Sequence, residues 1–360
     1  MKKLLIVVGT RPNFIKVTRF KKLAPEYGVE VRIVHTGQHY DSRMSEVFFE
    51  QFGLVPDHFL EIPPGSPNHQ MADIMIRLEE VLKVEGPDMV MVPGDVNSTF
   101  ASALTANKMG YPISHLESGL RSLDRSMPEE INRVLTDEIT DHYFVTEQSG
   151  LDNLVAEKRI GEVHFVGNTM IDTIVEFEKE IQASDILDIH KLESKDFVLM
   201  TIHRPATVDY VDQLQKLCDL ILSLAKDRKV VFPIHPRTIK NLEMFELMWE
   251  LKNHENVVLT EPLDYFAFQK LIATCKFIVT DSGGIQEEST FRRVPCLTLR
   301  PNTERPITIE IGTNELVEFD LEVIQNKVNE IISGKYKTGQ IPPFWDGHAT
   351  ERILGVLKEL

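Results

Sequence analysis

The sequence predicts an α/β protein with two doubly wound parallel sheets, one in each of two domains. Three observations support this fold class. Short runs rich in β-branched residues alternate with longer stretches of helical periodicity, and glycine, proline or aspartate stands at the joins. The chain has 360 residues, of which 42% are apolar, enough for about two domains with ordinary cores. The apolar runs also fall into two series, separated by a polar stretch.

Each strand is predicted from one short apolar run. The first, LLIVV, follows two lysines but is too short for a signal peptide, and no later run is long enough to span a bilayer. In the first series the candidate strands begin at Leu4, Val31, Met89, Pro112, His142 and His164. In the second series they begin at Phe197, Val230, Val257, Phe277 and Cys296. Alternation of such runs with helices predicts parallel sheets that are buried on both faces.

The polar stretch at about residues 178–196 is the expected hinge region between the domains. We therefore expect a first domain over residues 1–176 and a second over 177–345, with a C-terminal helix at 346–360 that joins the first domain. Two doubly wound domains would face each other across a cleft, with ligand bound where the carboxyl ends of the strands converge.

Charge and cysteine content exclude several classes of function. The net charge of −16 argues against binding of nucleic acid or of an anionic membrane surface, because both partners favour a dense basic face. The three cysteines, Cys218, Cys275 and Cys296, have neither disulfide-type nor metal-type spacing. We expect them to be core thiols of a cytoplasmic protein.

The first strand is followed by GTRPNFIK, in which Arg11 and Lys16 could bracket an anion. Taken alone, this segment is as compatible with a turn followed by a solvated helix as with an anion-binding site. The sequence contains no G-x-G-x-x-G and no G-x-x-x-x-G-K-[ST], so neither dinucleotide nor P-loop chemistry is indicated.

Carboxylates follow several strands of the first series. Asp95 lies in PGDVNST, Glu117 in PISHLESGLR, and Glu129 in MPEEINR beside Arg133. Any one of them could be a helix cap or a first-turn acid that favours the helix dipole. Together they resemble a general acid/base set, because removing and returning a proton at carbon takes two groups in opposite protonation states. Metal binding is the weaker alternative, since the acids come from separate loops without a histidine at ligand spacing.

The second series carries two histidines in equivalent positions. His203 in TIHRP and His235 in FPIHPR each follow an apolar strand and precede an arginine, which favours a phosphate or leaving-group site over two structural histidines. The segment DSGGIQEE follows the FIVT strand, and paired glycines at a helix start allow backbone N–H groups to approach a phosphate. LRPNTERP adds Arg300 and Arg305.

These motifs together resemble the non-hydrolysing UDP-N-acetylglucosamine 2-epimerases. The ordered series is GTRPNFIK, TGQHYD, GDVNST, HLESGLRS, MPEEINR, GNTMID, HR, HPR, DSGGIQEE and TERP, and it runs from the first strand almost to the C-terminal helix. The resemblance implies two Rossmann-like domains of the glycosyltransferase-B type in a homodimer. It also implies that UDP is held mainly by the second domain, and that the reaction needs no cofactor and no metal.

The resemblance further implies anti-elimination of UDP to a 2-acetamidoglucal, followed by re-addition with C2 inverted. By matching motif positions, the catalytic residues are Asp95, Glu117, Glu129 and His203. The positions that match substrate-binding residues are Arg11, Lys16, Arg133, His235, Phe268, Ser282, Gly283, Gly284, Glu288 and Arg305.

Alternatives remain open for the substrate and for the class of protein. Relatives acting on UDP-2,3-diacetamido-2,3-dideoxy-glucuronic acid share TGQHYD and MPEEINR, but LRPNTERPIT resembles the UDP-N-acetylglucosamine enzymes. Asp41 stands where relatives activated by a second substrate molecule have a basic loop, which argues against such activation. The hydrolysing epimerases differ around ESGLR. A glycosyltransferase of the same fold would need an acceptor site, and a non-catalytic UDP-sugar sensor would not need three carboxylates.

Overall fold

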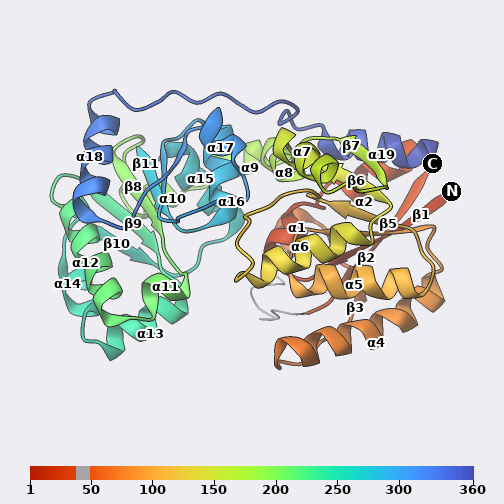
Figure 1. The fold of residues 1–360 in the computed structure, drawn as a ribbon. Coiled ribbons are helices and arrows are strands. Elements are labelled where there is room, and N and C mark those ends of the chain that lie inside the picture. The colour runs from red at the N-terminus through yellow and green to blue at the C-terminus, as the bar shows by residue number, and fades with distance from the viewer. Residues whose placement is uncertain (38–48) are drawn as a thin grey trace. The chain divides into compact units, whose positions relative to one another are not determined.

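The computed structural model of the protein describes residues 1–37 and 49–360. The chain forms two compact units, unit 1 (residues 1–176 and 343–360) and unit 2 (residues 177–342). Each unit is a parallel sheet with helices on both faces (Figure 1). The predicted α/β class with two doubly wound sheets is therefore confirmed. Asp41 and the rest of QHYD lie outside the described residues.

Unit 1 contains a seven-stranded sheet in the order β3-β2-β1-β4-β5-β6-β7. Its strands are β1 (Lys2–Val8), β2 (Val29–His35), β3 (His58–Phe59), β4 (Met89–Pro93), β5 (Ile113–Leu116), β6 (His142–Val145) and β7 (Glu162–Phe165). Its helices are α1 (Arg11–Ile15), α2 (Phe20–Leu23), the 3-10 helix η1 (Ala24–Tyr27), α4 (Pro67–Glu85), α5 (Asn97–Lys108), α6 (Pro128–Glu138), α7 (Gln148–Ala156), α8 (Thr169–Glu176) and α19 (Ala349–Glu359).

Unit 2 contains a six-stranded sheet in the order β10-β9-β8-β11-β12-β13. Its strands are β8 (Phe197–Thr201), β9 (Lys229–Pro233), β10 (Val257–Thr260), β11 (Phe277–Thr280), β12 (Cys296–Thr298) and β13 (Asn314–Leu316). Its helices are α9 (Glu178–Ala183), α10 (Ile186–Ile189), α11 (Pro205–Val208), α12 (Val211–Ala225), α13 (Pro236–Met244), α14 (Met248–Asn253), α15 (Tyr265–Thr274), α16 (Gly283–Arg292), α17 (Ile307–Glu310) and α18 (Leu321–Ile332).

The strand order fixes where ligands can bind. In unit 1 the chain builds outward from β1 to β3, then returns to the other side of β1 with β4. Unit 2 repeats this reversal between β8 and β11. Loops at the carboxyl ends of these strand pairs diverge to opposite faces, so each unit has a switch point where polar side chains can gather.

The stretch at residues 178–196 begins with two helices, α9 and α10, that pack against α15 within unit 2. At the other end of the chain, α19 packs against α2 and α8 in unit 1. Asp172 in α8 anchors α19, because its carboxylate accepts hydrogen bonds from the backbone N–H groups of Ala349 (3.0 Å) and Thr350 (2.6 Å) at the helix start. Trp345 also donates from Nε1 to the Thr146 carbonyl, at 3.0 Å.

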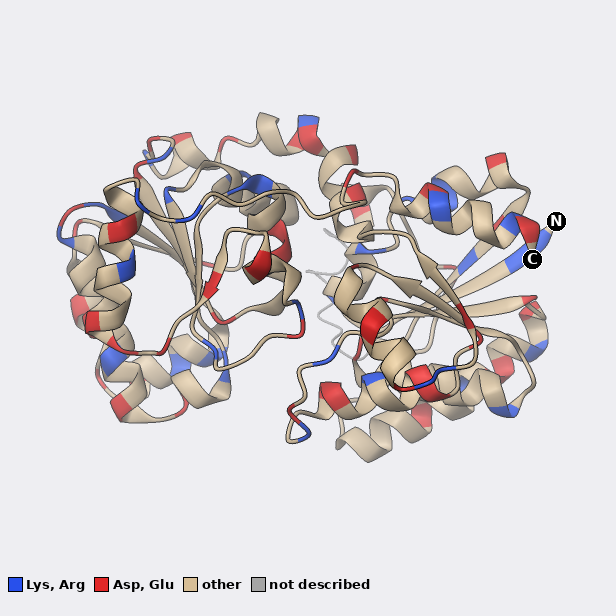
Figure 2. Cartoon of the chain, turned by 45° about the horizontal axis from the view of Figure 1, so that its top comes forward, with Lys and Arg blue, Asp and Glu red and all other residues tan. Residues whose placement is uncertain are grey.

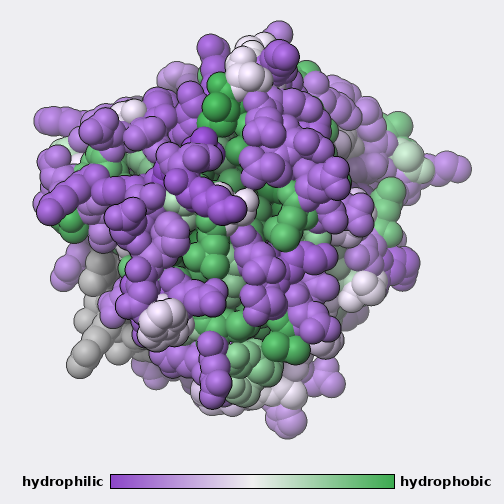
Figure 3. Space-filling view, turned by 90° about the vertical axis from the view of Figure 1, so that its left-hand side faces the viewer, coloured by the Kyte–Doolittle hydropathy of each residue, from purple (hydrophilic) through white to green (hydrophobic). Residues whose placement is uncertain are grey.

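The surface is mixed in charge and mostly hydrophilic. Acidic and basic residues are interspersed along the outer helices (Figure 2). The face of unit 2 seen in Figure 3 is dominated by hydrophilic side chains, with hydrophobic ones in narrow strips. Every helix among the described residues is too short or too polar to cross a membrane. The three cysteines are free and buried, as the sequence predicts.

Candidate active site

Three strand ends of unit 1 meet beside a buried ion pair between Lys16 and Glu117. Lys16 Nζ lies 2.5 Å from Glu117 Oε2, and the two side chains are 6% and 4% exposed. Gly94, which follows β4, lies against this pair: a Cβ there would be 3.3 Å from Lys16 Nζ and 2.8 Å from Nδ2 of Asn13. Gly94 has φ of 70° as well. Only glycine meets both demands, so β4 can end directly beside the pair.

Asp95, the next residue, pairs with a second cation. Its carboxylate forms an ion pair with Arg133 in α6, and the Asp95 side chain is 24% exposed. Arg133 is held from behind by Glu130, with Arg133 Nη1 3.0 Å from Glu130 Oε2. Glu130 is buried and also accepts hydrogen bonds from the backbone N–H groups of Ser122 and Leu123. The loop after β5, helix α6 and the loop after β4 are thereby fixed together.

Glu129 lies in the first turn of α6, and its side chain is exposed. The adjacent Glu130 carries the structural contacts. The MPEEINR motif thus contains one buried acid that orients Arg133 and one exposed acid available to a ligand. Arg11 begins α1 directly after β1 and is partly buried.

His115 and Asp137 support the turn at Gly94 from inside the sheet. His115 Nε2 faces the carbonyl oxygen of Gly94 at 2.8 Å, and Nδ1 faces Asp137 Oδ1 at 2.7 Å. Both ring nitrogens therefore lie within hydrogen-bond distance of an oxygen atom. Burial alone would raise the pKa of Asp137, but His115 and Arg121 bring it below its usual value. The buried triad of His115, Asp137 and Arg121 holds the Gly94 turn.

In unit 2, Asp281 organises the end of β8. Its Oδ2 accepts hydrogen bonds from the backbone N–H groups of His203 (2.9 Å) and Arg204 (2.7 Å). Its Oδ1 lies 3.0 Å from His203 Nδ1. Burial would raise the pKa of Asp281, but these donors lower it. Asp281 reaches these residues because β11, which it follows, lies beside β8 in the sheet.

The two histidines lie side by side. The ring centroids of His203 and His235 are 6.3 Å apart, and the His203 side chain is 48% exposed. His235 caps α13 by accepting a hydrogen bond from the Arg237 backbone N–H at 3.2 Å. Partial burial, together with His203 and Arg237, lowers the pKa of His235 and so favours a neutral ring. Both histidine side chains are exposed and so accessible to a ligand.

The amino terminus of α16 lies over a buried charge network. Ser282 is the N-cap residue, and Gly283 is the first residue of the helix. A Cβ at Gly283 would be 2.8 Å from Glu304 Oε1 and 3.2 Å from Arg305 Nη1. Glu304 also pairs with Arg300 at 3.0 Å. Arg300 and Arg305, held in place by Glu304, and the amino terminus of this ten-residue helix together favour an anion.

Three further predicted residues have local roles in unit 2. Glu288 lies in the second turn of α16 and is buried. Arg305 reaches the adjacent Glu287, with Nε 2.8 Å from Oε2. Phe268 lies in α15, which packs against α16, and its ring is half-buried against the adjoining core. The structure thus groups His203 with His235, and Gly283 with Arg305, whereas no described contact links Phe268 to either group.

Charged clusters at both switch points, on two doubly wound sheets, define the class of protein: an α/β enzyme with two Rossmann-like domains. Comparison with known proteins agrees with this class. The family model described as UDP-N-acetylglucosamine 2-epimerase matches residues 21–358. A UDP-N-acetylglucosamine 2-epimerase of Methanocaldococcus jannaschii is 38% identical over 368 residues, which cover 99% of this chain and 98% of the relative. The chain belongs to the UDP-N-acetylglucosamine 2-epimerase family.

Solved structures agree as well. The crystal structure of the Methanocaldococcus jannaschii UDP-GlcNAc 2-epimerase in complex with UDP-GlcNAc and UDP has a TM-score of 0.90 and 37% identity, and covers 99% of this chain and 100% of that one. A second relative, the UDP-2,3-diacetamido-2,3-dideoxy-D-glucuronate 2-epimerase of Pseudomonas aeruginosa, is 34% identical, and the match covers 99% of this chain and 100% of the relative. A sucrose-phosphate synthase of Thermosynechococcus elongatus, at 10% identity and a TM-score of 0.61, shows the fold alone.

Proposed function

We propose that this protein interconverts UDP-N-acetylglucosamine and UDP-N-acetylmannosamine by inverting C2 of the sugar. Beyond membership of the family, one observation carries the proposal. Glu117 and Asp95 follow the neighbouring strands β5 and β4, and each is held against its own cation, Lys16 or Arg133. Two carboxylates fixed at adjacent strand ends suit a reaction that moves a proton off a carbon and back.

The reaction proceeds by elimination and re-addition. A carboxylate takes the proton from C2 while the C1–O bond to UDP breaks, which leaves a C1–C2 double bond in a 2-acetamidoglucal. A protonated carboxyl group then delivers a proton to the opposite face of C2 as the UDP oxygen rebinds to C1. Asp95, Glu117 and Glu129 supply these proton-transfer groups. The two steps are redox-neutral, and exchange with solvent removes the proton gained by the first carboxylate and restores the proton lost by the second before the next turnover.

Unit 2 stabilises the departing UDP. The backbone N–H groups at Ser282, Gly283 and Gly284 would bind the diphosphate at the start of α16, where the helix dipole also favours negative charge. His203, oriented by Asp281, assists at the leaving group. Fixed donors lower the barrier because they stabilise charge that develops only as the C1–O bond breaks. Glu288 is assigned to the ribose hydroxyls, and Arg11, His235, Phe268 and Arg305 to the remaining substrate contacts.

The alternative substrate is UDP-2,3-diacetamido-2,3-dideoxy-glucuronic acid, on which the Pseudomonas aeruginosa relative is named as acting. The segment LRPNTERPIT favours the simpler sugar. The test is NMR of each nucleotide sugar incubated separately with the protein. A mixture of gluco and manno epimers from UDP-N-acetylglucosamine, at a kcat/KM at least about tenfold above that for the acidic sugar, supports the proposal. The reverse preference would assign the acidic sugar.

A glycosyltransferase of the same fold is the candidate from another class. It would leave UDP-N-acetylglucosamine unchanged until an acceptor is added, whereas the epimerase acts on the nucleotide sugar alone. We further infer a cytoplasmic homodimer that supplies the manno sugar to cell-surface polysaccharide. Analytical ultracentrifugation of the purified chain tests the dimer, and a monomer at micromolar concentration would contradict it.

A further inference from the structure

The starts of β6 and β7 bring together two histidines and a glutamate on one face of the unit 1 sheet. In the parallel register His142 is opposite Glu162, and Phe144 is opposite His164. Side chains alternate between the faces of a strand, so positions 162 and 164 share one face, and position 142 joins them from the next strand about 4.8 Å away. The backbone alone therefore collects the three side chains, whichever rotamers they adopt.

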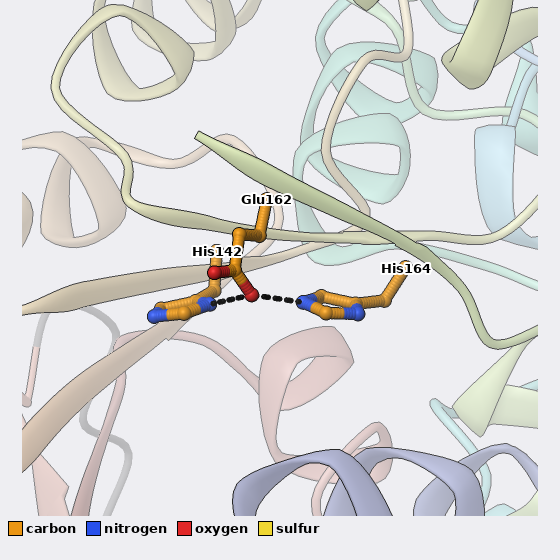
Figure 4. Close-up of side chains that lie close together, drawn as sticks. All are labelled: His142, Glu162 and His164. Atoms are coloured by element: carbon orange, nitrogen blue, oxygen red, sulfur yellow. Dashed lines mark ion pairs between the residues drawn. The ribbon is translucent and has the colours of Figure 1, made fainter. Parts of the chain in front are cut away.

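The carboxylate of Glu162 lies between the two imidazole rings (Figure 4). Glu162 Oε2 is 3.7 Å from His142 Nδ1 and 3.8 Å from His164 Nε2. The three ligand atoms all lie within 4.8 Å of one another. These distances are too long for hydrogen bonds. They lie close to the separation of about 3.4 Å between ligand atoms around a tetrahedral Zn²⁺, given metal–ligand bonds of about 2.0–2.2 Å.

Two ring nitrogens in this group lack hydrogen bonds. His142 Nδ1 and His164 Nε2 are both buried, and neither has a hydrogen-bond partner among the described residues. A buried polar atom without a partner destabilises the fold unless something else satisfies it. The Glu162 side chain is 65% exposed, which leaves the group accessible to a metal ion from solvent.

The backbone around the group is held tightly. Gly161, directly before β7, fits against β6 so closely that a Cβ would be 2.4 Å from the Asp141 carbonyl oxygen and 2.7 Å from the Tyr143 ring. The Glu162 N–H donates to that same carbonyl at 2.7 Å. Asp141 in turn accepts from the Ile113 N–H at 2.8 Å. The ligand-bearing positions are therefore fixed before any ion arrives, which reduces the entropic cost of binding.

We propose that His142, Glu162 and His164 bind one divalent transition-metal ion, with Zn²⁺ as the favoured occupant. Two neutral imidazoles and one carboxylate are typical ligands of Zn²⁺, whereas Mg²⁺ and Ca²⁺ prefer oxygen ligands alone. Three protein ligands leave the fourth tetrahedral position for water. This site is separate from the candidate active site, because it lies at the starts of β6 and β7 and not at the carboxyl ends of the strands.

The ion would be structural rather than catalytic. His142 and Glu162 are the first residues of β6 and β7, whereas Asp95 and Glu117 follow the carboxyl ends of their strands. β7 is the last strand of the sheet and has only four residues. An ion that ties β7 to β6 would stabilise this edge, because any ligand that binds only the folded state shifts the equilibrium toward it.

The test uses the full-length chain after treatment with EDTA and removal of the chelator. Isothermal titration with Zn²⁺ should give one ion per chain, Co²⁺ should show the visible absorption of a tetrahedral site, and Zn²⁺ should raise the thermal midpoint. His142→Asn and His164→Asn should each weaken Zn²⁺ binding by more than about tenfold and abolish the rise in midpoint. Glu162→Gln alters an exposed side chain and should leave the fold intact. Zn²⁺ binding can therefore be measured in this variant even if a histidine variant does not fold.

His348→Asn is the matched control. His348 Nδ1 lies 2.6 Å from Glu351 in an exposed pair on the C-terminal segment, with one imidazole and one carboxylate. The Zn²⁺ affinity of the His348→Asn variant should equal that of the unaltered protein. The proposal is overturned if Zn²⁺ shows no saturable binding, if Co²⁺ gives only octahedral spectra, or if the folded variants at positions 142, 162 and 164 bind Zn²⁺ as tightly as the control.

Discussion

Lys16 Nζ and Glu117 Oε2, which belong to residues 101 positions apart in the sequence, lie 2.5 Å apart inside unit 1. The side chains are almost completely buried, so neither charge is tolerable without the other. The pair therefore fixes Glu117 beside the turn that carries Asp95. The contact between Lys16 and Glu117 that stabilises the fold therefore also orients a carboxylate that we propose to be catalytic.

Removing one member of this pair should destabilise the protein more than removing both. Lys16→Met removes the cation that faces the buried carboxylate of Glu117, and the free energy of unfolding should fall by about 3–5 kcal/mol. The double variant Lys16→Met/Glu117→Leu should recover a substantial part of that loss while remaining inactive. Urea unfolding of both variants checks this. Lys83→Met, which removes an exposed lysine paired with Glu79 and Glu80, is the control and should change stability little. A double variant no more stable than Lys16→Met would contradict the prediction.

Substitutions at the adjacent acids Glu129 and Glu130 should have different effects, on turnover at Glu129 and on stability at Glu130. Glu129→Gln alters an exposed proton-transfer group, so turnover should fall by about 100-fold or more with little change in the free energy of unfolding. Glu130→Gln weakens a buried acceptor that holds Arg133 and the Ser122 loop, so stability should fall by about 1–3 kcal/mol. Steady-state kinetics and urea unfolding of both variants provide the comparison. Full turnover in Glu129→Gln at saturating substrate would remove that residue from the mechanism.

Gly283→Ala should weaken UDP binding without unfolding the protein. The added methyl group would meet Glu304 at 2.8 Å and Arg305 at 3.2 Å, and Glu304 cannot withdraw without breaking its pairs with Arg300 and Arg305. We expect UDP affinity, measured by calorimetry, to fall by more than about tenfold, equivalent to about 1.4 kcal/mol. Gly355→Ala is the matched control. Gly355 lies in α19 with open space around it, so alanine there should raise stability by about 1 kcal/mol and leave UDP affinity unchanged. Equal UDP affinity in the two variants would count against the α16 site.

His35 should make the fold acid-sensitive below neutral pH. Burial lowers the pKa of His35 from 6.5 to about 4, and its Nδ1 accepts a hydrogen bond from the Gly37 N–H at 3.0 Å. Between these two pKa values the unfolded chain binds the proton and the folded chain does not. The stabilisation is therefore complete above pH 6.5 and is lost as pH falls toward 4, by about 3 kcal/mol. His35→Asn should flatten this part of the pH profile of unfolding. An unchanged profile would show that other groups cause the sensitivity.

Sequence periodicity predicts most of the sheet but not two of its shortest strands. β3 has only two residues, and β13 reads Asn-Glu-Leu, so neither contains an apolar run, whereas the equally short β12 begins the run CLTLR. The polar stretch expected as a hinge forms α9 and α10, because a few apolar side chains such as Ile181 and Ile186 are buried within unit 2. Pattern alone does not reveal which polar segments find a surface to cover.

The candidate site shows the same limit. The sequence places polar residues at strand ends, but the pairings of Lys16 with Glu117 and of His203 with Asp281 depend on strand order, which brings distant segments together. The motif MPEEINR does not reveal that Glu130 is buried and Glu129 exposed. The group of His142, Glu162 and His164 depends on the register between β6 and β7, although the spacing Glu162-x-His164 on a strand was a readable signal.

The most direct test of the account is deuterium incorporation at C2. The protein is incubated with UDP-N-acetylglucosamine in deuterium oxide, and the C2 proton is followed by NMR. Elimination through a 2-acetamidoglucal predicts that both the gluco and the manno nucleotide lose the C2 proton signal as they interconvert, with no acceptor or coenzyme added. Formation of the manno nucleotide with its original C2 proton retained, or no exchange in the absence of an acceptor, would contradict the account.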